Sequence, residues 1–137
     1  MRPPGLARGV LLAAVGGALG GLARHGLDVL YGATTFPWST FTINVLGATV
    51  LALLPAIPAV ERRPNLAVLL GAGFLGGFTT LSAFSEQTRL LVDTGHQALA
   101  ATYVVGSLGA ALVAVLVVRR LTTPGERDAF RDEGGDA

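Results

Sequence analysis

Residues Gly71 to Glu86 read GAGFLGGFTTLSAFSE, and this stretch decides how the rest of the chain is interpreted. It overlaps a segment without ionisable side chains, Leu66 to Ser85, which is long enough to cross the hydrocarbon core of a bilayer as a helix. Paired glycines (Gly76-Gly77) and paired threonines (Thr79-Thr80) nevertheless lie at its centre. Irregular main chain at that depth is tolerated only where protein covers it or where it lines a cavity.

Two structures are compatible with this centre. A helix broken at the paired glycines would free carbonyl oxygens that can hold a cation, as in transporters with discontinuous helices. An unbroken helix would instead use Gly73 and Gly77 as a small-residue packing face. Spacing alone favours the unbroken helix.

Three further uncharged stretches occur, at Gly9–Ala23, Val29–Val60 and Gln97–Val118. Pro37 interrupts the second, and proline begins helices more readily than it continues them. The sequence therefore predicts an all-α integral membrane protein, a unit of residues 1–121 with four transmembrane helices at about residues 6–24, 38–58, 66–88 and 97–118. Residues 122–137 form a polar tail that we expect to be disordered.

The first stretch has a second interpretation, because Arg2 and Arg8 followed by an apolar run and a small-residue site at Gly21–Ala23 also fit a cleaved signal peptide. Its glycine-rich face and the three later spans favour a retained helix.

Composition excludes several functional classes. The chain has no Cys, and its ten basic residues are scattered arginines at a net charge of +1. Thiolate chemistry is therefore excluded, and no basic surface for nucleic acid is indicated. No nucleophile–base–acid set, Walker loop or HExxH motif is present, and the first, second and fourth spans contain no carboxylate. We expect no enzymatic activity.

The distribution of arginines predicts an orientation. Two lie near the ends of the spans on one side of the membrane, Arg24 and Arg89. Six lie on the other side: Arg2, Arg8, Arg62, Arg63, Arg119 and Arg120. The positive-inside rule then predicts that both termini are cytoplasmic.

Polar side chains within spans are costly in hydrocarbon and usually face another helix or a water-filled path. Asn44 in the second span fits interhelical hydrogen bonding and a functional role equally well. Thr79, Ser82 and Glu86 share one face of the third span, which is compatible with a wetted track or with hydroxyls bonded to their own helix.

Three further side chains are also ambiguous. Phe84 fits plain core packing, although its electropositive ring edge could meet an anion. Tyr103 and Ser107 of the fourth span face the same way and fit interhelical hydrogen bonding. Arg24 fits snorkelling and a buried structural role equally.

Three motifs in order resemble the CrcB/Fluc family of fluoride channels, from Gly16 to about Leu121. The most specific is GFLGGFTTLSAFS at residues 73–85, which is similar to the family's GFxGGxTTFSTFS. TINVLG at residues 42–47 is similar to its xVNxxG, and Gly16-Gly17-x-x-Gly20-Gly21-x-x-Arg24 supports both.

The resemblance implies an antiparallel (inverted) dimer with two pores, each lined by both subunits. It implies that the third helix is broken at its centre, contrary to the preference from spacing. It also implies a sodium ion at the dimer interface, held by the backbone carbonyls of Gly76 and Thr79. The implied function is passive export of cytoplasmic fluoride across the plasma membrane.

The resemblance also assigns pore residues. Asn44 and Ser107 would hydrogen-bond the anion or its waters, Thr80 and Ser82 would join a polar track, and Tyr103 would line the route. Phe84 would present an aromatic edge, and Arg24 would serve the structure or a vestibule. Leu81 occupies the position of the first of the family's two pore Phe residues, Ala83 that of a Thr, and Gln87 that of a Glu.

The sequence leaves more than one possibility for how the subunit assembles and for what it does. The bias of the arginines favours a subunit that inserts one way and pairs with an oppositely oriented paralogue, which would supply the missing Phe. A dual-topology homodimer that tolerates Leu81 is about equally compatible. A small dual-topology exporter of the multidrug-resistance type would need a carboxylate in its first span, which this chain lacks. A non-conducting partner subunit or scaffold is the remaining class.

Overall fold

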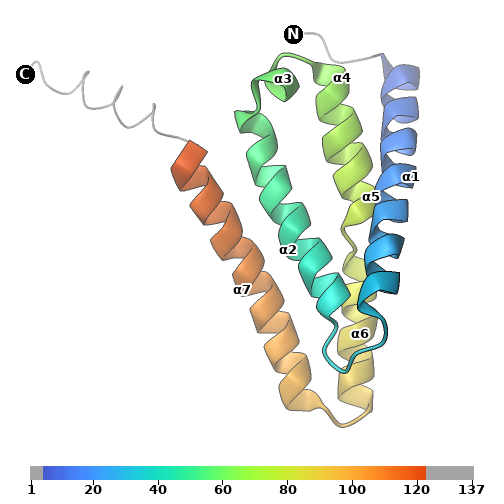
Figure 1. Cartoon of the computed structure of the whole chain (residues 1–137), viewed down its shortest axis with the longest axis vertical. Helices are drawn as coiled ribbons and strands as arrows, with labels where there is room; N and C mark the ends of the chain where they lie inside the picture. The colour runs from blue at the N-terminus through green and yellow to red at the C-terminus, as the bar shows by residue number, and fades with distance from the viewer. Residues whose placement is uncertain (1–4, 123–137) are drawn as a thin grey trace, which may run out of the picture.

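The computed structural model describes residues 5–122, and among these it contains helices, turns and loops but no strand (Figure 1). The polar tail predicted at 122–137 lies outside the described residues apart from Thr122, as does Arg2. In chain order the elements are α1 (Leu6–Tyr31), α2 (Trp38–Leu53), the 3₁₀ turn η1 (Leu54–Ala56), α3 (Pro58–Glu61), α4 (Pro64–Ala67), the π-helix η2 (Val68–Leu75), α5 (Gly76–Phe78), α6 (Leu81–Asp93) and α7 (Gln97–Thr122).

Four helical segments of the described chain are long and apolar enough to cross a membrane: Leu6–Tyr31, Trp38–Ala56, Pro64–Asp93 and Gln97–Thr122. The protein is a multi-pass membrane protein, and the prediction of an all-helical chain with four spans is confirmed. The first segment runs to Tyr31 because the next residue, Gly32, turns the chain with a positive φ of 63°.

The spans lie side by side, and the third span contacts both the first and the fourth (Figure 1). Helix α1 packs along η2 and α5 of the third span, whereas α2 packs along α7 and α6 packs against α7. The beginning of α1 and the short helices α3 and α4 lie at one end of the bundle. The connections from α1 to α2 and from α6 to α7 lie at the other end.

The third span changes its main-chain conformation several times. The π-helix η2 is followed by the single turn α5, which ends at Phe78. Thr79 (φ −75°, ψ 155°) and Thr80 (φ −148°, ψ 116°) are extended, and α6 begins at Leu81. We call Thr79–Thr80 the extended segment; it separates α5 from α6 in Figure 1.

Glycines allow α1 to contact the main chain of the third span directly. A Cβ atom added at Gly16 would overlap the carbonyl oxygen of Leu69, and one added at Gly20 would overlap that of Phe74. This close approach, typical of small-residue interfaces between membrane helices, fixes the height of η2 and α5 relative to α1.

We expect Gly20→Ala to lower the free energy of unfolding by about 1–3 kcal/mol, because the added methyl group collides with main chain that cannot rotate away. Gly21→Ala is the matched control, since nothing lies within 4 Å of a Cβ at that glycine. Alanine is also the better helix former, so the control should be neutral or stabilising. Unfolding in detergent micelles measures both variants; equal loss in the two would contradict the role of Gly20.

Candidate functional site

The side chain of Asn44 on α2 holds the main chain of the extended segment. The N–H of Thr80 donates to Asn44 Oδ1 at 2.9 Å, and Asn44 Nδ2 donates to the carbonyl oxygen of Thr80 at 3.1 Å. The amide thus pairs with both peptide groups of one residue, as a neighbouring strand would. An unpaired peptide group within a membrane costs several kcal/mol, so this pair makes extended main chain tolerable at that depth.

The hydroxyl group of Thr80 begins the next helix. Thr80 Oγ1 accepts a hydrogen bond from the N–H of Ala83 at 3.1 Å, which caps α6, and lies 3.1 Å from the hydroxyl oxygen of Ser82. Thr80 is buried, whereas Ser82 is exposed on the surface of the chain. The sequence-predicted residues Asn44, Thr80 and Ser82 therefore form one connected hydrogen-bonded group.

The hydrogen bonds to Asn44 and to the Thr80 hydroxyl deprive the carbonyl groups of Gly76 and Thr79 of the donors that a regular helix would provide. In an uninterrupted helix the N–H of Thr80 would pair with the carbonyl of Gly76, and that of Ala83 with the carbonyl of Thr79. Here the two N–H groups donate to Asn44 and to the Thr80 hydroxyl instead. Gly76 and Thr79, the residues expected to hold sodium, line a cavity of about 320 Å³ together with Asn44, Gly47, Ala48, Leu51, Gly71 and Leu75.

A second cavity, of about 240 Å³, opens on another side of the extended segment. It is lined by Asn44, Thr79, Thr80, Leu81, Phe84, Ser107, Leu108 and Ala111. We call it the central cavity. Ser107 is only 5% exposed, and its hydroxyl oxygen has no hydrogen-bond partner. A buried hydroxyl without a partner is unfavourable, so it indicates a ligand or water in the central cavity.

Phe84 connects the central cavity to an aromatic cluster behind it. Its ring centroid lies 5.0 Å from that of Tyr103, which is fully buried. The Tyr103 hydroxyl donates to Gln87 Oε1 at 3.0 Å. Tyr103 is thus placed to support Phe84 and does not itself line the central cavity. Residues 16 positions apart on different helices give no sequence signal for such a bond.

Two predicted residues lie apart from this hydrogen-bonded group. Leu81 lines the central cavity but is 77% exposed in the single chain, so the cavity is open on that side. Arg24 was expected at the end of the first span, but α1 continues to Tyr31, so Arg24 is half-buried about two turns before the helix ends, and its side chain has no partner within residues 5–122. It lines neither cavity beside the extended segment.

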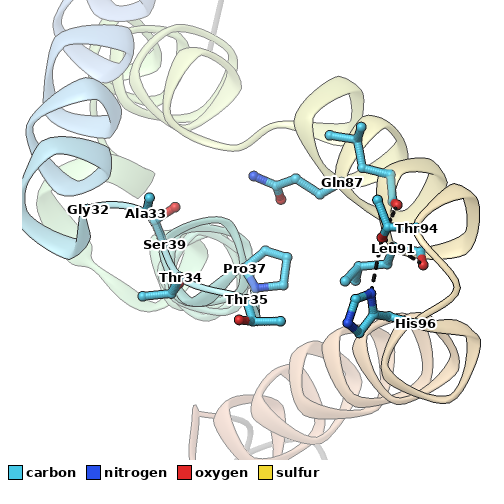
Figure 2. A pocket seen from close by; sticks show the side chains of 11 residues that line it. Gly32, Ala33, Thr34, Thr35, Pro37, Ser39, Gln87, Leu91, Thr94 and His96 are labelled. Carbon is cyan, nitrogen blue, oxygen red and sulfur yellow. Dashed lines mark hydrogen bonds between the residues drawn. The ribbon is translucent and has the colours of Figure 1, made fainter.

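A third cavity, of about 480 Å³, lies at the end of the bundle where α1 connects to α2 and α6 connects to α7 (Figure 2). We call this end the loop end. The lining of the cavity brings together polar side chains from the α1–α2 connection and the start of α2 on one side, and from α6 and the α6–α7 connection on the other: Thr34, Thr35, Ser39, Gln87, Thr94 and His96. His96 Nδ1 lies 3.1 Å from Thr94 Oγ1. Sequence reasoning missed this cavity, because its two walls are about fifty positions apart. Gln87 links it to Tyr103 and so to the aromatic side of the central cavity.

Comparison with known proteins identifies the family. The profile of the family described as "CrcB-like protein, Camphor Resistance (CrcB)" matches residues 11–118. The chain belongs to this CrcB-like family. The match includes the extended segment and residues from all four spans, and it confirms the family resemblance found in the motifs.

Named relatives of the CrcB-like chain are ion channels. It is 44% identical over 108 residues to the "Fluoride-specific ion channel FluC" of Paracoccus denitrificans, covering 77% of this chain and 87% of the relative. It is 39% identical to "Fluoride-specific ion channel FluC 2" of Listeria monocytogenes serotype 4b, covering 82% and 88%. For the protein of the same name from Bacillus subtilis, identity is 37% and coverage is 87% and 94%. The family to which the chain belongs is therefore non-enzymatic.

We expect Thr80→Val to lower the free energy of unfolding by about 0.5–2 kcal/mol, because it removes the cap of α6. Thr102→Val is the matched control, since the Thr102 hydroxyl is exposed and donates only to its own helix, at the Ala98 carbonyl. The control should stay within about 0.5 kcal/mol of the wild type. Denaturant titration in micelles compares the two, and equal stability would argue against the cap.

Proposed function

We propose that this chain is a subunit of a fluoride-selective channel of the plasma (cytoplasmic) membrane, which exports cytoplasmic fluoride passively. The observation that carries the proposal is the central cavity, where the buried Ser107 hydroxyl has no partner. Relatives at 37–44% identity that are named fluoride-specific ion channels support the choice of anion. Movement down a gradient needs no nucleotide, redox group or proton-coupling carboxylate.

Fluoride is small and strongly hydrated, so a pore must replace its lost water with hydrogen-bond donors. Ser107 supplies an O–H group. Asn44 has two N–H bonds and commits one to the Thr80 carbonyl, which leaves the other for the anion. The ring edge of Phe84 adds an electropositive group without a formal charge. These three donors line one small cavity and together suit a small anion.

The proposed route continues along polar groups on either side. The hydroxyls of Thr80 and Ser82 extend it at the extended segment. Tyr103 and Gln87 form the polar boundary toward the cavity at the loop end, where hydroxyl groups could exchange with the waters of the anion. In this arrangement Arg24 contributes positive potential in the second half of α1.

The subunit is proposed to act as an antiparallel dimer with two pores. Support comes from the open side of the central cavity, where Leu81 and Ser82 are exposed in the single chain. Lipid tails beside this polar cavity would leave its donors unsatisfied, whereas a second subunit would close it. The partner is either an inverted copy or an oppositely oriented paralogue; the bias of arginines favours the paralogue.

A sodium ion is proposed beside the extended segment, held by the carbonyl oxygens of Gly76 and Thr79. Both oxygens lack the helical donors that an uninterrupted helix would give them. Neutral carbonyl oxygens, with no carboxylate among the residues that line their cavity, suit a hard monovalent cation, as in transporters with unwound helices. When bound, the ion would supply fixed positive charge at the broken third helix.

An exporter and a non-conducting subunit each explain fewer of these observations than a fluoride channel does. A multidrug-type exporter would need a carboxylate within the membrane in its first span, and the one carboxylate of α1, Asp28, is exposed in the last turn of that helix. A non-conducting partner subunit or scaffold would give no fluoride flux with any partner, and it would not explain why Ser107 stays unpaired.

Fluoride efflux from liposomes, followed with a fluoride electrode, tests the channel. We expect Asn44→Asp to reduce flux at least about 100-fold, because a carboxylate at the cavity repels the anion. Phe84→Ile should reduce it roughly tenfold through loss of the ring edge. Ser107→Ala should reduce flux while leaving stability unchanged or higher, since it removes an unpaired hydroxyl.

Thr102→Ala is the control, because the Thr102 hydroxyl is exposed, donates to its own helix at Ala98 and lines neither cavity beside the extended segment. Its flux should equal that of the wild type. Undiminished flux in the folded Asn44→Asp and Ser107→Ala proteins would reject the central cavity as the conducting site.

Leu81→Phe tests how the subunit assembles. If a paralogue normally supplies the missing aromatic edge, the wild-type chain alone should conduct weakly and Leu81→Phe should raise its flux about tenfold. Leu11→Phe, at an exposed position of α1, a helix that contributes no residue to the central cavity, should change nothing. Robust flux from the wild-type chain alone, with no gain in Leu81→Phe, would favour the homodimer instead.

A further inference from the structure

A cavity of about 430 Å³ lies at the end of the bundle opposite the loop-end cavity, between α1 and the start of the third span. Its lining divides into two chemical parts. Leu12, Leu66 and Leu69 form an apolar part. Arg62 and Arg63, with Pro64 and Asn65, form a polar rim where the third span begins. We call it the arginine-rimmed cavity.

The contact between the glycines of α1 and the third span closes the floor of this cavity. A Cβ on Gly16 would overlap the Leu69 carbonyl oxygen, so the two segments touch there. Leu12 lies one helical turn nearer the membrane surface on the same face of α1. The apolar part therefore extends from the rim toward the bilayer interior, parallel to lipid tails.

The rim carries unneutralised positive charge. The side chains of Arg62 and Arg63 are exposed and have no hydrogen-bond or ion-pair partner within residues 5–122. Glu61 precedes them but does not line the cavity. Arg8 lies one turn beyond Leu12 on α1, which adds a third cation near the same rim.

We propose that the arginine-rimmed cavity binds an anionic phospholipid. Its phosphate would pair with the guanidinium groups of Arg62 and Arg63, which match phosphate oxygens in a two-pronged geometry. The upper part of an acyl chain would lie along Leu12, Leu66 and Leu69. Basic pockets between transmembrane helices at the membrane surface recognise anionic headgroups in this way.

The apolar part distinguishes a lipid from free phosphate. A free anion would gain the two arginines but would leave the three leucines beside it uncovered. A zwitterionic lipid would cover the leucines but would present a choline or amine group to the cationic rim. Only an anionic lipid satisfies both parts, and the site is independent of fluoride conduction.

Native mass spectrometry of the full-length protein in neutral detergent tests the proposal, with phosphatidylglycerol, phosphatidylcholine and inorganic phosphate as probes. We expect phosphatidylglycerol to be retained in preference to phosphatidylcholine. The Arg62→Gln/Arg63→Gln protein should bind phosphatidylglycerol about 30-fold more weakly, at roughly fivefold for each charge. Leu12→Trp, which fills the apolar part without changing charge, should also weaken binding.

The Arg119→Gln/Arg120→Gln protein is the matched control, because it loses the same charge outside this cavity. Its binding of phosphatidylglycerol should equal that of the wild type, and all variants should keep the wild-type thermal midpoint within a few degrees. Equal retention of both lipids, equal loss in the control protein, or displacement of the lipid by inorganic phosphate would each overturn the proposal.

Discussion

The pairing of one side-chain amide with one residue's main chain supports the centre of this molecule. Asn44 donates to the carbonyl of Thr80 and accepts from its N–H. In water such a pair would add little, because solvent could replace it. Between lipid tails nothing else can, so the extended segment depends on α2 for its conformation. Because Thr80 also caps α6, the direction of that helix depends on the same contact.

Close contacts between glycine and main chain give this pairing its precision. Gly20 and Gly16 hold α1 against the main chain of the third span at Leu69, Phe74 and Phe78. On α2, a Cβ at Gly47 would overlap the Thr79 methyl group, so α2 also lies directly against the extended segment. Gly47 lies three residues after Asn44 on one face of the helix. The small residue therefore sets the distance at which the amide reaches Thr80.

The four spans could be predicted from the sequence, whereas the contacts of the extended segment could not. The absence of charge over long stretches sufficed for four spans, because the cost of burying charge in lipid is large and independent of tertiary detail. Spacing favoured regular helix at Thr79 and Thr80, because helix propensity is local, whereas the partner of Thr80 lies 36 positions away. The Tyr103–Gln87 bond and the unpaired Ser107 depend in the same way on helix–helix geometry. The motifs singled out residues such as Asn44, Thr80 and Phe84, but the contacts of these residues required the structure.

Hydrogen-bond donors line the cavity on one side of the extended segment, and carbonyl acceptors line the cavity on the other side. The two sides therefore favour ions of opposite charge. Ser107 and Asn44, whose side chains carry donors, line the central cavity, while Gly76 and Thr79, whose carbonyls have lost their helical donors, line the other cavity. Asn44 and Thr79 line both cavities, so the two lie close together. In the proposed channel, a cation at the carbonyls would attract an anion at the donors across this short, poorly screened distance. The attraction would offset part of the free energy that the anion loses with its hydration. No charged side chain would then be needed in the pore, where such a charge would bind a permeating ion too tightly.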